Sequence, residues 1–288
     1  MEKWRAGARE SVTAFPHSSV SSSSVPLMAS PLSTRREKEI ASLSRRRYRQ
    51  KHGQTIVEGH RALRSALDAG APLVDVVVTR DALDAPNVQM LTARLDVTVH
   101  VTDDATMDRL TDVQTHQGVL GVVERRLTDP GAIPDRLGDA GTVLLLDGVQ
   151  DPGNVGTILR TAAWFGVDAV VAGPGTAGGY SPKVMRAAAG GHWDVALART
   201  DTPGALLDAL RKAGCALYGA DLHGVSARDW TPDSPSALVL GSEAHGLSVA
   251  VLDRIDAPVA LPGAAHRAGA ESLNVAVASG ILVYEWTG

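Results

Sequence analysis

Short apolar runs alternate with helical periodicity through the second half of the chain. β-branched and other apolar residues predict strands over 143–146, 169–171, 195–197, 216–219, 237–240 and 259–261. Helices are expected from about Val155, after Ser181-Pro182, and from Thr202-Pro203 to Gly214. This alternation predicts an α/β fold whose mostly parallel sheet carries helices on both faces. Periodicity leaves open whether the sheet is an ordinary doubly wound one or something rarer.

The first half of the chain predicts a smaller α/β domain over residues 31–128. Strands are expected over 55–59, 73–79, 97–101 and 119–124, with a helix over 60–69 that Gly70 ends. Proline and glycine over 129–140 predict a linker, so 141–288 form the second domain. Residues 1–30 are rich in serine and are expected to be disordered. A transit peptide, or translation that starts at Met28, are the open alternatives for this extension.

Composition favours a globular protein of the cytoplasm that has no membrane partner. Hydrophobic residues make up 44% of the 288, and the mean hydropathy is near zero. No apolar run approaches the roughly 18 residues that a membrane span needs. The single cysteine, Cys215, cannot form an internal disulfide, which fits a reducing compartment. Since it lies in an apolar run, we expect a buried strand residue and not a nucleophile.

Positive charge gathers near the start of the first domain, although the net charge of the chain is −4. Ten Lys or Arg lie between positions 35 and 64, opposed by three Glu. This asymmetry favours a phosphate-binding surface, with a solvated basic helix as an equal alternative. Ahead of the expected strand over 55–59, a mobile basic arm could reach RNA. The candidate RNA-binding residues are Arg45, Arg46, Arg47, Arg49, Lys51 and Arg61.

A first polar motif, Asp-Gly-Val-Gln-Asp-Pro-Gly-Asn-Val-Gly over 147–156, follows the strand over 143–146. Ligands of parallel α/β sheets collect at the carboxyl ends of strands, where this motif lies. We expect Asn154 to cap the helix from Val155. Gly156 and Arg160 are four residues apart and share a helix face, and the glycine leaves room for a ribose or a backbone. A capped helix with a surface arginine is the plainer alternative.

A second motif, Leu-Gly-Ser-Glu-Ala-His-Gly-Leu-Ser over 240–248, follows the strand over 237–240. Gly241 allows a bulky ligand to approach the backbone closely. Glu243 is expected to pair with Arg160 and to fix the direction of its guanidinium. The alternative is an acidic residue that the helix dipole favours near a helix start.

A third motif combines Leu261-Pro262 with Glu-Ser-Leu-Asn-Val-Ala-Val-Ala over 271–278. Residues 273–284 predict a nearly all-apolar helix, which must be buried in the core or in a subunit interface. Ser272 is an ordinary N-cap candidate for it. Asn274 is the unusual residue, because a polar amide at the start of a buried helix needs a partner.

Several other chemistries lack their motifs in this sequence. The histidines have no metal-ligand spacing, and with one cysteine nothing calls for a metal. A nucleophile elbow, a phosphate-binding Gly-x-x-x-x-Gly-Lys loop and a Gly-x-Gly-x-x-Gly dinucleotide fingerprint are also missing. A nucleotide-dependent enzyme of ordinary doubly wound topology is therefore disfavoured.

In this order, the three motifs resemble those of the SpoU (TrmH-type) RNA ribose 2'-O-methyltransferases, from about Thr142 to Glu285. Residues 181–187 are similar to an intermediate stretch of that family, and 35–125 to its ribosomal-protein-like substrate-binding domain. The resemblance implies a trefoil-knotted SPOUT catalytic domain that acts as a homodimer. General rules of topology would not predict a knot.

The resemblance also implies methyl transfer from S-adenosylmethionine to a ribose 2'-hydroxyl of RNA, ribosomal RNA above all. The implied catalytic residues are Asn154, Arg160, Glu243, Ser272 and Asn274. The implied cofactor-binding residues are Leu240, Gly241, Ser242, Gly246, Leu261, Pro262, Ser272 and Leu273. The arginine of this motif is often described as the general base in the family. Because a guanidinium resists deprotonation, we expect Arg160 instead to stabilise an alkoxide or to bind the ribose-phosphate.

The sequence departs from the family pattern in places. Ser242 stands where Asn is frequent, Ala244 where Gly is usual and Ala188 where Ser is common. Eight residues, 263–270, separate Pro262 from Glu271, more than is usual, and this loop is expected to reshape the cofactor pocket. Two alternatives stay open: a catalytically inactive RNA-binding or ribosome-assembly factor on the same fold, and a transfer-RNA 2'-O-methyltransferase. Cofactor binding separates the inactive factor from an enzyme.

Overall fold

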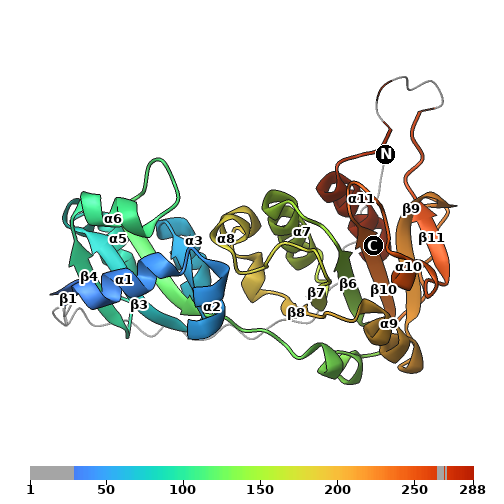
Figure 1. Ribbon diagram of the computed structural model, residues 1–288, viewed down its shortest axis with the longest axis horizontal. Helices are drawn as coiled ribbons and strands as arrows, with labels where there is room; N and C mark the ends of the chain where they lie inside the picture. The colour runs from blue at the N-terminus through green and yellow to red at the C-terminus, as the bar shows by residue number, and fades with distance from the viewer. Residues whose placement is uncertain (1–28, 265–268, 270) are drawn as a thin grey trace, which may run out of the picture.

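The computed structural model describes residues 29–264, 269 and 271–288, which form two sheets lying side by side along the long axis of the molecule (Figure 1). The expectation of disorder therefore lies outside the described residues for positions 1–28. Ala29 and Ser30, which were expected to belong to the same extension, lie in a strand.

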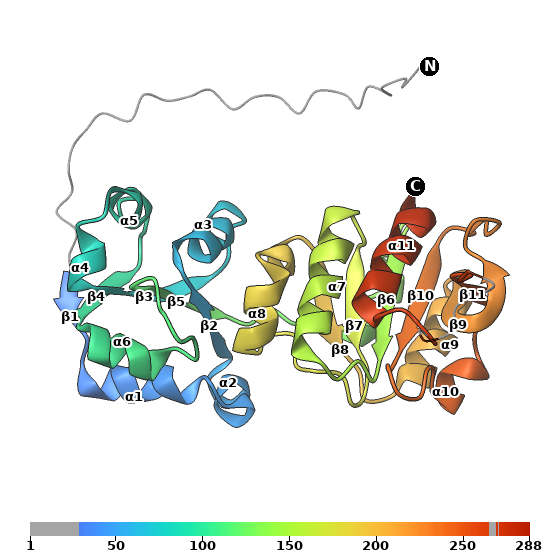
Figure 2. The same cartoon turned by 90° about the horizontal axis from the view of Figure 1, so that it is seen from above.

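The first sheet has five strands in the order β1-β4-β3-β5-β2. The β1–β4 and β4–β3 pairs are parallel, and β3–β5 and β5–β2 are antiparallel. Helices α1 and α6 cover one face, and α3, α4 and α5 cover the other (Figure 2). In chain order the elements are β1 (Ala29–Pro31), α1 (Thr34–Ser42), α2 (Arg46–His52), β2 (Gln54–Glu58), α3 (His60–Asp68), β3 (Leu73–Thr79), α4 (Arg80–Leu83), α5 (Pro86–Thr92), β4 (Thr98–Thr102), α6 (Asp104–Leu110) and β5 (Val119–Glu124).

The second sheet has six strands, all parallel, in the order β11-β9-β10-β6-β7-β8. Its elements are the 3-10 helices η1 (Pro130–Ala132) and η2 (Pro134–Arg136), β6 (Thr142–Asp147), α7 (Pro152–Trp164), β7 (Ala169–Ala172), α8 (Pro182–Ala188), η3 (Gly191–Trp193), β8 (Ala196–Arg199), α9 (Pro203–Lys212), β9 (Ala216–Ser226), β10 (Ser236–Gly241), α10 (Val249–Leu252), β11 (Ala257–Ala260) and α11 (Val275–Thr287). This arrangement confirms the predicted α/β class and the parallel sheet. The knot stays a prediction.

Alternation along β6 divides the core of the second domain between the two faces of its sheet. Leu144 and Leu146 join a cluster with apolar residues of α7, α8 and α11. Val143 and Leu145 face the opposite way and join residues of α9 and α10. A strand that is buried on both faces has a continuous apolar sequence, which is why 143–146 could be recognised as one.

Strand β2 and helix α8 join the two domains. The Thr55 hydroxyl donates to the carbonyl of Tyr180 at 2.8 Å, and Arg186 bonds Glu58 at 2.7 Å. The Tyr180 hydroxyl in turn donates to the carbonyl of Arg126 at 2.7 Å. The domains therefore meet through specific polar contacts as well as apolar ones.

Two expectations about local structure were wrong. The basic cluster forms helix α2 and not a mobile arm, because its long side chains favour a helix and Gly53, at φ 65°, ends it. The expected first strand, over 55–59, is preceded by β1. A third expectation, that the last helix is buried in the core or in a subunit interface, is not contradicted: α11 buries one side in the core, while Val277, Ile281 and Tyr284 stay between 41% and 60% exposed.

Candidate functional site

Motifs one and two lie side by side because the strands that carry them are register partners. Asp147 at the end of β6 pairs with Gly241 at the end of β10. The buried Asp147 carboxylate accepts a hydrogen bond from the Ser248 backbone at 2.6 Å and ties the two loops together. Both loops therefore open at the carboxyl edge of the sheet, where parallel α/β folds bind ligands.

Asp151, and not Asn154, caps helix α7. The Asp151 carboxylate accepts from the backbone of Asn154 at 2.9 Å, and this hydrogen bond holds the pKa of Asp151 below its usual value. Pro152 occupies the first helical turn, which fixes the cap at the residue before it. The Asn154 side chain is therefore released from capping.

The Asn154 side chain instead joins all three motifs. Its Nδ2 donates to Glu243 Oε1 at 2.7 Å, and its Oδ1 accepts from Asn274 Nδ2 at 3.1 Å. Asn274 Oδ1 also accepts from the backbone of Ala276 and Val277, so Asn274 and not Ser272 caps α11. Three residues that are far apart in the sequence thus form one hydrogen-bonded chain, and each holds the next in place.

The expected ion pair between Glu243 and Arg160 is absent among the described residues. Arg160 lies six positions after Asn154 on α7, about 9 Å further along and about 120° around the axis. Its side chain therefore leaves the helix in another direction, where it is exposed and makes no hydrogen bond or ion pair with any described group. The structure brings Asn154, Glu243 and Asn274 together, but not Arg160.

Gly156 leaves room for a neighbouring backbone, one of its two expected roles. A Cβ there would overlap Ala187 and lie 2.8 Å from the carbonyl of Val184, so the glycine allows α7 and α8 to touch. Of the two expected occupants of this space, a ribose or a backbone, the structure shows the backbone of α8.

The second motif is a closed loop. Ser242 and Gly246 exchange two backbone hydrogen bonds of 2.9 Å, and Gly246 has φ 66°. A Cβ on Gly241 would overlap the backbone of Gly246, so only glycine fits at the start of this loop. The loop presents Glu243 toward Asn154.

Thr176 was missed by the sequence reasoning, yet it fixes motif one. Its hydroxyl donates to the carbonyl of Leu146 at 2.7 Å and accepts from the backbone of Gly148 at 3.1 Å. The backbone of Ala177 donates to Val149 at 2.9 Å. The segment 173–180 therefore braces motif one from the side of β7. No motif in the sequence marked this threonine.

The residues expected to hold a cofactor surround one edge of the sheet. Leu240 is buried, Gly241, Ser242 and Leu261 are half-buried, and Gly246, Pro262, Ser272 and Leu273 are exposed. Within the described residues, the backbone N–H groups of Leu261 and Leu273 make no backbone hydrogen bond. Backbone donors beside glycine-lined backbone are the groups that bind the ring edges of an adenine, which is the chemistry that S-adenosylmethionine requires. Five of the eight residues between Pro262 and Glu271, namely 265–268 and 270, lie outside the described residues, so the expectation that this loop reshapes the cofactor pocket stays a prediction.

The candidate RNA-binding residues divide into two groups. Arg49 is buried, and its guanidinium donates to the carbonyls of Leu43 and Ser44 at 2.8 and 2.6 Å, so it is structural. Burial, with repulsion from neighbouring arginines, lowers its pKa. The other candidates are exposed: Arg45, Arg46, Arg47 and Lys51 lie on α2 or at its N-cap, and Arg61 lies on α3.

The described residues show neither a metal-binding cluster nor a helix that could span a membrane. No group of three or more His, Cys, Asp or Glu is placed to hold a metal ion. No helix in that part of the chain is long and apolar enough to cross a membrane.

Comparisons with known proteins follow the same division into two parts. Residues 141–284 match the model of the SpoU rRNA Methylase family, and residues 35–121 match that of an MRM3-like substrate binding domain. The 23S rRNA (guanosine(2553)-2'-O)-methyltransferase RlmP of Bacillus subtilis is 32% identical over 252 residues, which cover 87% of this chain and 95% of RlmP.

Two solved structures resemble both domains together. The SpoU methyltransferase AviRb from Streptomyces viridochromogenes, in complex with AdoMet, has a TM-score of 0.79 at 26% identity and covers 89% of this chain and 97% of its own. An AdoMet-bound rRNA methyltransferase from Sinorhizobium meliloti has a TM-score of 0.77 at 27% identity and covers 89% and 95%.

Proposed function

Because the chain belongs to the SpoU rRNA methylase family, as the three motifs predict, we propose that it transfers a methyl group from S-adenosylmethionine to a ribose 2'-hydroxyl of RNA. The observation that carries the proposal is the hydrogen-bonded chain of Asn154, Glu243 and Asn274. It joins one residue from each motif at the edge of the sheet where ligands bind.

The chemistry requires position more than reactivity. S-adenosylmethionine supplies an electrophilic methyl group, and the hydroxyl must approach it in line. Glu243 and Asn274 hold Asn154 from both sides, which leaves one amide hydrogen of Asn154 to orient the ribose. A network whose members satisfy one another keeps this geometry before the substrate arrives.

Arg160 is proposed to act on the ribose-phosphate and not on Glu243. Its guanidinium is exposed and engages no described partner, so it is available to RNA. A planar fork suits a phosphate or a developing alkoxide, whereas loss of its proton does not suit an arginine. An Arg160→Lys enzyme with near-normal rate would count against a need for the fork.

Ribosomal RNA is the proposed substrate, and 23S rRNA in particular. The printed name of RlmP specifies 23S rRNA, and the first domain of this chain matches a substrate-binding model. Exposed cations of helix α2 supply a basic surface on that domain. The reaction is assigned to the cytoplasm, where RNA and cofactor meet and where the lone buried Cys215 stays reduced.

A homodimer is proposed through helix α11. Val277, Ile281 and Tyr284 along it, and Leu273 just before it, are between 41% and 60% exposed, and Trp164 at the end of the adjacent α7 is 82% exposed. Such a contiguous apolar face indicates an interface. Val277→Asp is expected to convert a dimer to a monomer in light scattering, whereas Thr157→Ala, on the exposed side of α7, is not.

The experiment that tests the activity uses the purified chain with tritiated S-adenosylmethionine and protein-free 23S rRNA or transfer RNA. Label in 23S rRNA that maps to a ribose 2'-oxygen, and that is lost with Arg160→Ala, is the expected result. Label in transfer RNA alone would favour the transfer-RNA alternative. No label and no cofactor binding would favour an inactive assembly factor.

A further inference from the structure

A cleft between the two domains is lined by four arginines, and it lies apart from the three motifs. Its walls come from segments far apart in the sequence: Arg46, Arg49 and Gln50 of α2, Arg125 and Leu127, the loop 178–181, and Ala172 and 197–199 from β7 and β8. The cavity of about 50 Å³ has room for a few water-sized oxygens, at roughly 10–15 Å³ each. That leaves room for the oxygens of one phosphate group.

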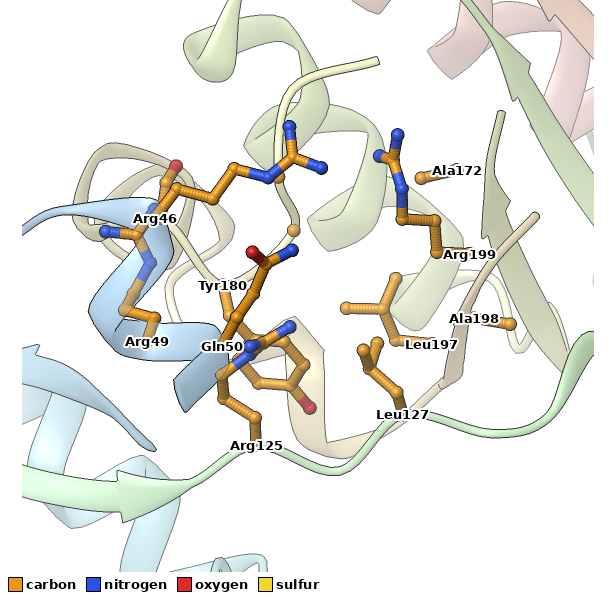
Figure 3. Close-up of a pocket in the computed structure, with 13 residues that line it drawn as sticks. Arg46, Arg49, Gln50, Arg125, Leu127, Ala172, Tyr180, Leu197, Ala198 and Arg199 are labelled. Atoms are coloured by element: carbon orange, nitrogen blue, oxygen red, sulfur yellow. The ribbon is translucent and has the colours of Figure 1, made fainter. Parts of the chain in front are cut away.

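Arginines from both domains face this cleft. Arg46 reaches in from α2 and Arg199 from β8, and they point toward one another across the opening (Figure 3). Arg125 lies below them with its guanidinium 5.6 Å from the centre of the Tyr180 ring. Its buried Nε has no hydrogen-bond partner among the described residues. The cleft therefore presents guanidinium forks that are not saturated by protein acceptors.

Negative charge does not balance these cations. Among the described residues, the lining holds no Asp or Glu, and the one carboxylate within ion-pair reach of Arg199 is Asp201, at 3.5 Å and 86% exposed. Such an exposed pair is weak. Burial lowers the pKa of Arg125, and the charge of Arg46 lowers it further. A cluster of like charges in a partly dry cleft is stabilised when an anion enters it.

The cleft and the motif site share one wall. Residues 173–180 brace Gly148 and Val149 of motif one through Thr176 and Ala177. The end of the same segment lines the cleft. Both sites also open at the carboxyl edge of the second sheet, since Ala172 and Arg199 end β7 and β8. An RNA strand that is bound at one site therefore passes close to the other.

We propose that this cleft binds one backbone phosphate of the substrate RNA, held between Arg46 of the first domain and Arg199 of the second. The inference rests on the proposed function, because the cleft would be a second contact with the same RNA, away from the site that binds the ribose. Arginine forks bind phosphate oxygens in pairs, and Gln50 offers a further amide donor. A phosphate that bridges two domains would fix the RNA relative to the methyl-transfer site.

The test compares Arg46→Gln, Arg199→Gln and the double variant with the wild-type chain. Binding to protein-free 23S rRNA is measured at several salt concentrations, and S-adenosylmethionine binding is measured by equilibrium dialysis. One lost phosphate contact lowers the slope of log K against log salt by about 0.7–0.9. Because both arginines hold the same phosphate, the double variant is expected to lose about one contact and not two, with cofactor affinity unchanged.

Lys212→Gln is the matched control, since it removes one exposed charge from the last turn of α9, which leads into the opposite end of the sheet. Its slope is expected to equal that of the wild type. If the Arg46 and Arg199 variants also have the slope of the wild type, the proposal is overturned. If their unfolding temperature is lowered as well, the two arginines stabilise the contact between the domains and do not bind a phosphate. A wild-type chain that methylates no RNA refutes the proposed function itself and is recognised without any variant.

Discussion

Two polar regions lie at the same edge of the second sheet. In one the polar groups are paired with each other, and in the other the cations are not balanced by anions. In the motif site, Asn154, Glu243 and Asn274 satisfy one another. In the interdomain cleft, Arg46 and Arg125 face like charge without a carboxylate in the lining. A satisfied network keeps its geometry without a ligand, whereas an unbalanced one is completed by a ligand. The first arrangement suits catalysis and the second suits capture of a polyanion.

Truncation of Asn154 is expected to have the largest effect on activity. Asn154→Ala removes the residue that links the other two motifs and lowers kcat by about 10²–10³-fold, the range for one positioned hydrogen-bond donor. Single-turnover methylation of 23S rRNA measures it. Thr157→Ala, an exposed change one turn further along α7, is the control and should leave kcat unaltered. A normal rate for Asn154→Ala would show that the network does not orient the ribose.

Gly241→Ala is expected to displace the loop that carries Glu243 in the motif site. The new methyl group overlaps the backbone of Gly246, so the loop that carries Glu243 must move, at a cost of about 1–3 kcal/mol in the free energy of unfolding. Denaturant unfolding and equilibrium dialysis of S-adenosylmethionine measure the two consequences. Gly138→Ala, where a methyl group meets open space, should change neither. Unaltered cofactor affinity in Gly241→Ala would mean that this loop does not border the cofactor.

Two arginines of helix α2 are expected to have different roles: Arg49 stabilises the fold and Arg46 binds RNA. Arg49→Met removes two hydrogen bonds to carbonyls and is expected to lower the free energy of unfolding by about 1–3 kcal/mol. Arg46→Met alters an exposed side chain, and its stability should stay within about 0.5 kcal/mol of the wild type. Urea unfolding of both variants decides the point. The account fails here if Arg46→Met proves the more destabilised.

Acid is expected to lower the free energy of unfolding through His192, which holds the segment that lines the cleft. His192 Nε2 donates to the carbonyl of Gly179 at 2.6 Å, and burial lowers the pKa of His192 to about 4. Its Nδ1 is buried and has no partner in the described part of the chain, so a proton there finds no acceptor in it. The unfolded chain therefore binds that proton from about pH 6.5 downward while the folded chain does not.

The sign of this effect follows from the two pKa values. The stability that neutral His192 gives is complete above about pH 6.5 and is lost as the pH falls toward about 4. Between pH 7 and 5.5 the loss amounts to about 1 kcal/mol. Urea unfolding at both values measures it, with His192→Gln as the comparison because glutamine keeps a donor for Gly179. An equal loss in the variant would assign the acid sensitivity to other groups.

The strands were predictable and the site was only partly so. Strands that are buried on both faces have continuous apolar, β-branched sequences, which is why 73–79 and 119–124 were predicted at their observed bounds. Asn154 was taken for a cap because two polar residues, Asp151 and Asn154, precede the helical pattern. Pro152 between them was the available signal, since proline favours the first helical position.

The cleft could not be predicted from the sequence. Arg46, Arg125 and Arg199 lie more than seventy residues apart from one another, and only the docking of β2 on α8 brings their segments together. Motif reasoning finds residues whose spacing is local, as in 147–156. Charge counts found the basic segment, but they could not tell the buried Arg49 from the exposed Arg46.

A double-mutant cycle across Asn154 and Glu243 tests the central claim most directly, namely that the motifs work as one hydrogen-bonded unit. Single-turnover methyl transfer to 23S rRNA is measured for Asn154→Ala, Glu243→Ala, the double variant and the wild type. Residues that act as a unit are not additive, so the double variant should be about as slow as Asn154→Ala alone. Rate losses that multiply would mean that the two side chains act independently, and this would contradict the account.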